Sequence, residues 1–76
     1  MPKKPHRVAL GRAVRTLRQE RGWTLESLAA EAGLHWTYVG GIERGERNPS
    51  WDNVVKLTSA LDVSLTELAR LIDGEK

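Results

Sequence analysis

The feature that most constrains this chain is a set of small and apolar residues at fixed spacing within residues 25–44. Two helices that cross through a short turn need a small residue where they touch, a glycine in the turn and apolar residues that seat the second helix. The window supplies these types in order, as Ala29, Gly33, Leu34, Val39 and Ile42. The pattern predicts one helix over 25–32 and a second over about 36–44.

An amphipathic helix is expected before this window. Apolar residues at positions 10, 14 and 17 recur at helical spacing over about 7–21, and Gly22 ends the pattern. Thr24 offers a side-chain oxygen as N-cap for the helix over 25–32, and Gly33 can close that helix in the left-handed conformation. The first half of the chain is therefore predicted to be two helices, each ended by a glycine.

Two further helices are expected after the window. Ser50 follows the turn sequence RGERNPS and can cap a helix over about 51–61. Ser64, with Glu67 three residues later, has the pattern of a capping box for a last helix over about 65–72. The large apolar residues expected in the core, besides those of the window, are Trp23, Trp51, Val54, Leu57 and Leu61.

At 76 residues the chain has room for one small domain. No segment alternates between apolar and polar residues, so we expect a compact all-α fold of five short helices over 8–72, with a flexible basic arm at 1–7 and a tail at 73–76. The chain has no cysteine, which excludes disulfides and thiolate metal sites. It has no apolar run near the roughly 18 residues of a membrane span and no signal-peptide pattern, so a cytoplasmic protein is expected.

The net charge of +2 hides an uneven distribution of charge. Residues 1–21 carry seven basic side chains against one acidic, a net charge of +6, whereas residues 22–76 carry five basic and nine acidic, a net charge of −4. Such asymmetry favours a polyanionic partner, although a solvated first helix with a basic tail would have the same composition. Charge alone therefore suggests nucleic acid without establishing it.

The window and the segment IERGERNPS together resemble the Cro/phage-repressor type of helix-turn-helix, also called the Xre family. The resemblance covers about residues 8–72 and, through the pattern LH-x-TY-x-x-GIERGERNPS, is greatest to the controller proteins of restriction–modification systems. It implies a sequence-specific transcriptional regulator that binds an inverted-repeat DNA operator as a homodimer and uses no cofactor. RNA polymerase is a further candidate partner.

The resemblance also implies roles for single residues. The helix over 36–44 would lie in the major groove of the DNA, with basic side chains of the first helix on phosphates. Arg18 and Glu43 match an ion pair that ties the first helix to this recognition helix. The residues expected to contact or face DNA are Trp36, Thr37, Tyr38, Gly40, Gly41, Arg44, Arg47, Asn48 and Arg15. For Tyr38 a packing role, and for Asn48 a turn role, remain alternatives.

Gly40 and Gly41 stand side by side within the predicted recognition helix, where each glycine costs roughly 1 kcal/mol relative to alanine. Both are expected to face outward. We favour the interpretation that the missing side chains let the helix backbone approach DNA, over the alternative that a short helix merely tolerates two poor helix formers.

Three residues depart from the family pattern. Leu25 stands where the family usually has a phosphate-contacting glutamine, Trp36 where the controllers often have arginine, and Gly41 where many repressors have a polar residue. These departures support one other function, a helix-turn-helix module that binds only protein. An antitoxin that uses this fold to bind both DNA and a toxin is a second alternative. Trp36 fits a DNA surface and a protein surface equally well.

A separate oligomerisation domain does not fit in a chain of this length, so dimerisation would use the helices themselves. The last helix has surplus apolar residues for this purpose: Leu65, Leu68, Leu71 and Ile72. His35, where the family prefers serine or threonine, is expected to be a weak N-cap. His6 and His35 have no nucleophile or metal-ligand cluster at suggestive spacing, so neither a catalytic site nor a metal site is predicted.

Overall fold

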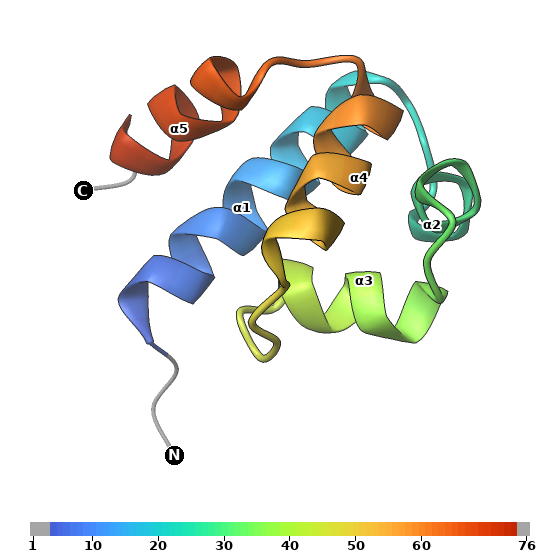
Figure 1. Cartoon of the computed structure of the whole chain (residues 1–76), viewed down its shortest axis with the longest axis horizontal. Coiled ribbons are helices and arrows are strands. Elements are labelled where there is room, and N and C mark those ends of the chain that lie inside the picture. Colours follow the sequence, from blue (N-terminus) through green and yellow to red (C-terminus); the bar gives the residue numbers. More distant parts are fainter. Residues whose placement is uncertain (1–3, 75–76) are drawn as a thin grey trace.

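In the computed structural model, which describes residues 4–74, five helices and no strand are found in that range (Figure 1). The predicted all-α fold is confirmed, with small changes at both ends of the domain. The first helix includes residues 5–7, which the sequence pattern places in the arm, and the last helix extends two residues beyond its predicted end. Residues 1–3 of the arm and 75–76 of the tail lie outside the described range. The helices are α1 (Pro5–Glu20), α2 (Leu25–Ala32), α3 (Trp36–Glu43), α4 (Trp51–Leu61) and α5 (Leu65–Gly74).

The helix ends follow the chemistry of their capping residues. The hydroxyl oxygens of Thr24, Ser50 and Ser64 each accept the backbone N–H three residues later, at 3.1, 3.2 and 3.0 Å. These bonds satisfy amides that have no partner within the helix. Gly33 ends α2 with φ of 70°, as predicted, and Asp62 ends α4 in the same left-handed region with φ of 56°.

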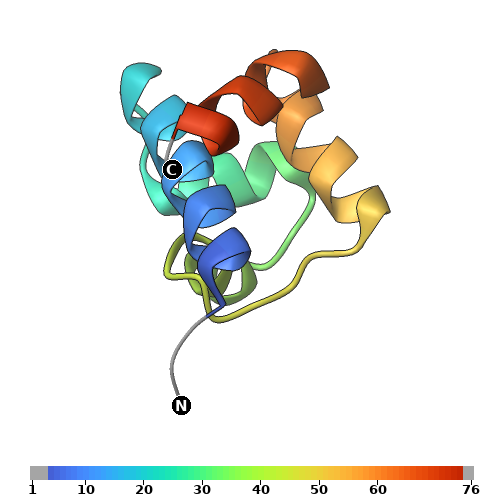
Figure 2. The same cartoon turned by 90° about the vertical axis from the view of Figure 1, so that its left-hand side faces the viewer.

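The core lies between the helices: α1 packs against α3, α4 and α5, and α2 packs against α3 and α4. Figures 1 and 2 show this arrangement of the five helices. Trp51, expected in this core, is 66% exposed because it begins α4, whose first turn reaches the edge of the molecule. Trp23 is partly buried against the core, and the Arg21 guanidinium carbon lies 4.5 Å from its ring centroid. The largest fully buried side chains come from four of the helices: Val14, Leu28, Val39, Ile42, Leu57 and Leu61.

Glycines bring the end of α3 close to α1. A Cβ atom on Gly11 would lie 2.3 Å from the carbonyl oxygen of Ile42 and 2.5 Å from that of Glu43, so the two helices touch backbone to backbone. Just after α3, Gly45 has φ of +77°, and a Cβ there would lie 2.9 Å from Val8 Cγ2. These close approaches at Gly11 and Gly45 therefore fix the position of the end of α3 on α1. None of the helices within residues 4–74 combines the length and the apolar character needed to cross a membrane.

Candidate nucleic-acid interface

The first turn of α3 is exposed on the side of the molecule away from α5 (Figure 1). His35 is the N-cap: its Nδ1 accepts the backbone N–H of Thr37 at 3.2 Å and lies 2.7 Å from the Thr37 hydroxyl. Its ring stacks on Trp36, with ring centroids 5.9 Å apart, and Trp36 is 51% exposed. The start of α3 therefore offers solvent an indole and a hydroxyl that are held by one histidine.

The far end of α3 is held to α1 by an ion pair. Arg18 Nε and Nη2 donate to the two carboxylate oxygens of Glu43 at 2.7 and 2.9 Å, and Arg18 Nη1 donates to the Trp23 carbonyl at 2.9 Å. The two side chains are only 13% and 8% exposed. The hydrogen bond to Glu43 raises the pKa of Arg18 above its ordinary value. Such a bidentate pair fixes the orientation of α3 as well as its distance from α1.

Gly40 and Gly41 are buried, so the prediction that they face outward is wrong. A Cβ on Gly40 would lie 3.1 Å from both Arg44 Nη1 and Leu25 Cδ2, and a Cβ on Gly41 would lie 2.5 Å from Arg47 Cγ. The space above the two glycines is filled by these three side chains. Leu25, Arg44 and Arg47 therefore lie where a bare helix backbone would face DNA, and the interpretation that the backbone approaches DNA here stays a prediction.

The two arginines that cover the glycines, Arg44 and Arg47, are exposed, and each contacts a neighbouring side chain. Arg44, with a side chain 58% exposed, donates from Nε to Glu46 Oε1 at 3.1 Å. The Arg47 guanidinium carbon lies 5.9 Å from the ring centroid of Tyr38, and the Tyr38 hydroxyl accepts a hydrogen bond from Asn53 Nδ2 at 2.9 Å. The Arg44 guanidinium therefore lies over Gly40, and the stem of Arg47 packs on Gly41.

Two other residues expected to contact DNA lie outside α3. Asn48 is exposed in the turn between α3 and α4, and Arg15 is exposed on α1, one turn before Arg18. Sequence reasoning missed Asn53, which the spacing of apolar residues does not mark, and Gly11, whose place inside a helical pattern was the available signal.

The expected dimer residues of α5 fall into three groups. Leu68 is only 4% exposed and belongs to the core, so its assignment to an interface is wrong. Leu71 and Ile72 are partly buried against the core, and Leu65 is 39% exposed. The helical pattern did not separate the side of α5 that packs on α1 from the side that faces solvent.

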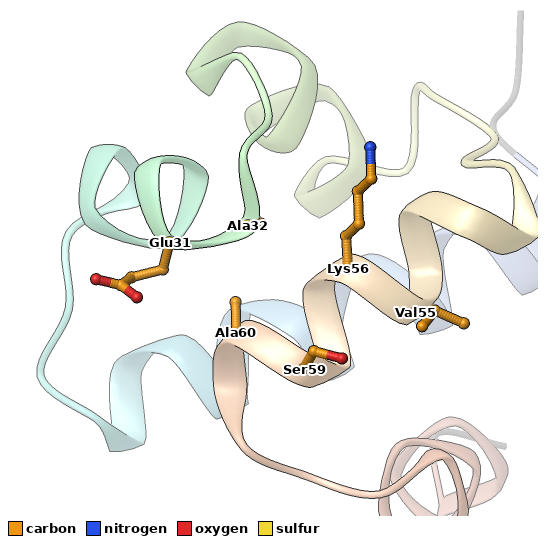
Figure 3. A pocket seen from close by; sticks show the side chains of 6 residues that line it. All are labelled: Glu31, Ala32, Val55, Lys56, Ser59 and Ala60. Carbon is orange, nitrogen blue, oxygen red and sulfur yellow. The ribbon is translucent and has the colours of Figure 1, made fainter.

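Other apolar side chains are exposed on α4. Trp51 and Val55, one turn apart, are 66% and 37% exposed. Val55 borders an open hollow between α2 and α4, where an acidic side chain of α2 and a basic side chain of α4 point in different directions on either side of small residues (Figure 3). The other residues that line the hollow are Glu31, Ala32, Lys56, Ser59 and Ala60.

The family model described as helix-turn-helix matches residues 14–68 of the chain. This span includes both helices of the window, the ion pair and the buried glycines. The chain belongs to the helix-turn-helix family. The match confirms the resemblance to the Cro/phage-repressor type that the sequence predicted.

Relatives of this helix-turn-helix protein include controller proteins. It is 43% identical over 63 residues to the control protein C.BamHI of Bacillus amyloliquefaciens, covering 82% of this chain and 78% of that protein. It is also 40% identical over 60 residues to the transcriptional regulator SlrR of Bacillus subtilis, where the match covers 78% of this chain but only 40% of the longer relative.

Solved structures of controller proteins share the fold of this helix-turn-helix protein. The controller C.AhdI of Aeromonas hydrophila is 47% identical, with a TM-score of 0.80 over 82% of this chain and 94% of the other. The controller C.Esp1396I, solved as a tetramer in complex with its natural 35 base-pair operator, is 28% identical, with a TM-score of 0.86 over 92% of each chain.

Proposed function

We propose that this helix-turn-helix protein, a DNA-binding transcriptional regulator by family, acts as a controller that binds an inverted-repeat operator as a homodimer. One observation supports this most: α3 is locked to α1 by the Arg18–Glu43 pair and yet exposes Trp36 and Thr37 at its start. A rigid helix with an exposed first turn suits the reading of base edges in the major groove.

The surrounding charges suit the DNA backbone. Arg44 and Arg47 extend along α3, and Asn48 is exposed in the turn that follows. Arg15 adds an exposed cation on α1, within the part of the chain whose net charge is +6. We assign phosphate contacts to these four residues and base contacts to Trp36 and Thr37 at the start of α3. Such a regulator would act in the cytoplasm, beside the DNA that it controls.

We place the dimer contact on α4 and the start of α5. Trp51, Val55 and Leu65 are exposed large apolar side chains, which a soluble protein commonly covers with a partner. The hollow beside Val55 carries Glu31 on α2 and Lys56 on α4. In a two-fold symmetric contact each of these charges can face its opposite in the second copy, as an isologous interface requires.

A gel-shift assay with DNA from upstream of the protein's own gene tests the proposal. We expect a shifted complex that competitor DNA of scrambled sequence does not displace. Folded protein that shifts neither DNA would contradict the proposal and favour a module that binds only protein. Transcription in vitro from the same DNA would then show whether bound protein recruits RNA polymerase or blocks it.

A further inference from the structure

Asn53 is a polar residue outside the recognition helix that contacts one of its side chains. It lies in the first turn of α4, where its backbone N–H donates to the Ser50 hydroxyl at 3.2 Å. Its side-chain nitrogen donates to the Tyr38 hydroxyl at 2.9 Å. Both Asn53 and Tyr38 are partly buried, so this hydrogen bond ties the start of α4 to α3 in a sheltered position.

The direction of this hydrogen bond decides what the Tyr38 hydroxyl can do next. A phenol oxygen both accepts and donates, whereas an amide NH₂ group only donates. Because Asn53 Nδ2 donates to the Tyr38 oxygen, the hydroxyl proton of Tyr38 stays available for another acceptor. Phosphate oxygens of DNA accept hydrogen bonds and do not donate them.

The ring of Tyr38 also lies under a cation. The Arg47 guanidinium carbon is 5.9 Å from the ring centroid, and the Arg47 stem packs on Gly41. A ring held in place by Asn53 therefore gives the guanidinium a fixed aromatic face. Asn53, Tyr38 and Arg47 form a row that starts on α4 and ends at the turn after α3.

We propose that Asn53 is a positioning residue for DNA binding: it sets the Tyr38 hydroxyl as a donor toward a DNA phosphate and holds the ring on which Arg47 rests. Asn53 acts through Tyr38 and does not itself touch DNA. This inference rests on the proposed function, since it assigns the operator as the ligand of the same surface.

A double-mutant cycle on operator affinity tests the inference. Asn53→Ala should weaken binding about tenfold, which corresponds to the loss of one good hydrogen bond at the interface. Tyr38→Phe should weaken it by a similar factor. If Asn53 acts through the Tyr38 hydroxyl, the double variant should bind within about twofold of Tyr38→Phe alone. Gln19→Ala, which removes an exposed amide side chain from α1, is the matched control and should bind as the wild type does.

Asn53→Asp adds a second readout. A carboxylate can only accept, so it would take the Tyr38 proton away from the phosphate, and we expect a larger loss than for Asn53→Ala. In the Tyr38→Phe background the excess loss should shrink to the effect of the added negative charge.

Three outcomes would overturn the inference. Losses that multiply in the double variant would mean that Asn53 acts independently of Tyr38. A lower melting temperature for Asn53→Ala with unchanged affinity would mean that Asn53 is only structural. If the wild type itself does not bind the operator, the proposed function and this inference both fail. If the wild type binds but the losses of the two single variants multiply in the double variant, only the inference fails.

Discussion

Gly41 is covered by the stem of Arg47, and Gly40 by Leu25 and the guanidinium of Arg44. Glycine is needed at position 41 because the Arg47 stem occupies the space that a Cβ would take, whereas at position 40 a Cβ would meet only the ends of the Arg44 and Leu25 side chains. At the scale of single residues, the two glycines therefore leave room for the side chains of Arg44 and Arg47 and so influence how these side chains are oriented. The cost of roughly 1 kcal/mol for each glycine in the helix is offset by this packing.

Gly41→Ala should weaken DNA binding with little change in stability. Its Cβ would lie 2.5 Å from Arg47 Cγ, so the arginine stem must move and its guanidinium must leave the Tyr38 ring. The gain in helix propensity of roughly 1 kcal/mol opposes the lost packing, so the unfolding free energy should change by less than about 1 kcal/mol. Fluorescence anisotropy with the operator and thermal unfolding measure the two effects.

Gly40→Ala is the matched control for this substitution. Its Cβ would meet Arg44 Nη1 and Leu25 Cδ2 at 3.1 Å, a tight distance that mobile side-chain ends can relieve. We therefore expect a smaller loss of affinity than for Gly41→Ala. Equal losses, or a Gly41→Ala variant that binds as tightly as the wild type, would contradict the role given to Arg47.

Gly11→Ala should destabilise the fold although alanine is the better helix former. The added Cβ would lie 2.3 Å from the Ile42 carbonyl oxygen, and a helix backbone cannot yield as a side chain does. Overpacking of this kind typically costs about 1–3 kcal/mol. A loss of 1 kcal/mol lowers the melting temperature of a domain this small by about 4–8 °C. Gly74→Ala is the control, because a Cβ on Gly74 would meet nothing within 4 Å. A raised melting temperature for Gly11→Ala would contradict the close contact between α1 and α3.

At the scale of elements, the sequence predicts the helices and their caps well because these depend on local chemistry. Thr24, Ser50 and Ser64 cap the helices that they precede, and Gly33 ends α2. Helical spacing does not say how far a helix extends beyond the core, so Trp51 was expected to be buried. The candidate site was predicted by resemblance, but which side chains cover the glycines depends on distant packing.

The contact between α1 and α3 depends on Arg18 as well as Gly11. Arg18→Ala leaves the Glu43 carboxylate, 8% exposed, without its cation. Breaking a fully buried pair costs about 3–5 kcal/mol, and this part-buried pair should cost less. We expect a fall in melting temperature of at least about 4 °C. Arg15→Ala, an exposed arginine on the same helix, should change the unfolding free energy by less than about 0.5 kcal/mol. Equal melting temperatures for the two variants would show that the Arg18–Glu43 pair does not stabilise the contact between α1 and α3.

The pH dependence of this pair follows from the direction of the pKa shift. The hydrogen bond to Glu43 raises the pKa of Arg18 in the folded state. The stability that a raised pKa contributes is fully present at pH values below the unfolded-state pKa. It is lost only as the pH rises through the folded-state pKa. The folded-state and unfolded-state pKa values of an arginine both lie far above neutral pH. Between about pH 6 and about pH 9, deprotonation of Arg18 should therefore not change the unfolding free energy.

At the scale of the whole molecule, the exposed apolar residues of α4 and α5 are expected to join two copies. Trp51→Asp combined with Val55→Asp should give a folded monomer with weak operator affinity, because the isologous contact is lost. Analytical ultracentrifugation measures the mass, and circular dichroism checks the fold. A wild type that is monomeric at tens of micromolar and still binds DNA tightly would contradict the dimer.

The uneven charge of the chain gives the central claim its most direct test, the salt dependence of operator binding. Each phosphate contact releases counterions and contributes about −0.9 to the slope of log affinity against log salt on B-DNA. With Arg15, Arg44 and Arg47 contributed by each protomer, we predict a slope steeper than about −3 per dimer by fluorescence anisotropy. A slope near zero would show that this surface does not bind the DNA backbone and would contradict the account.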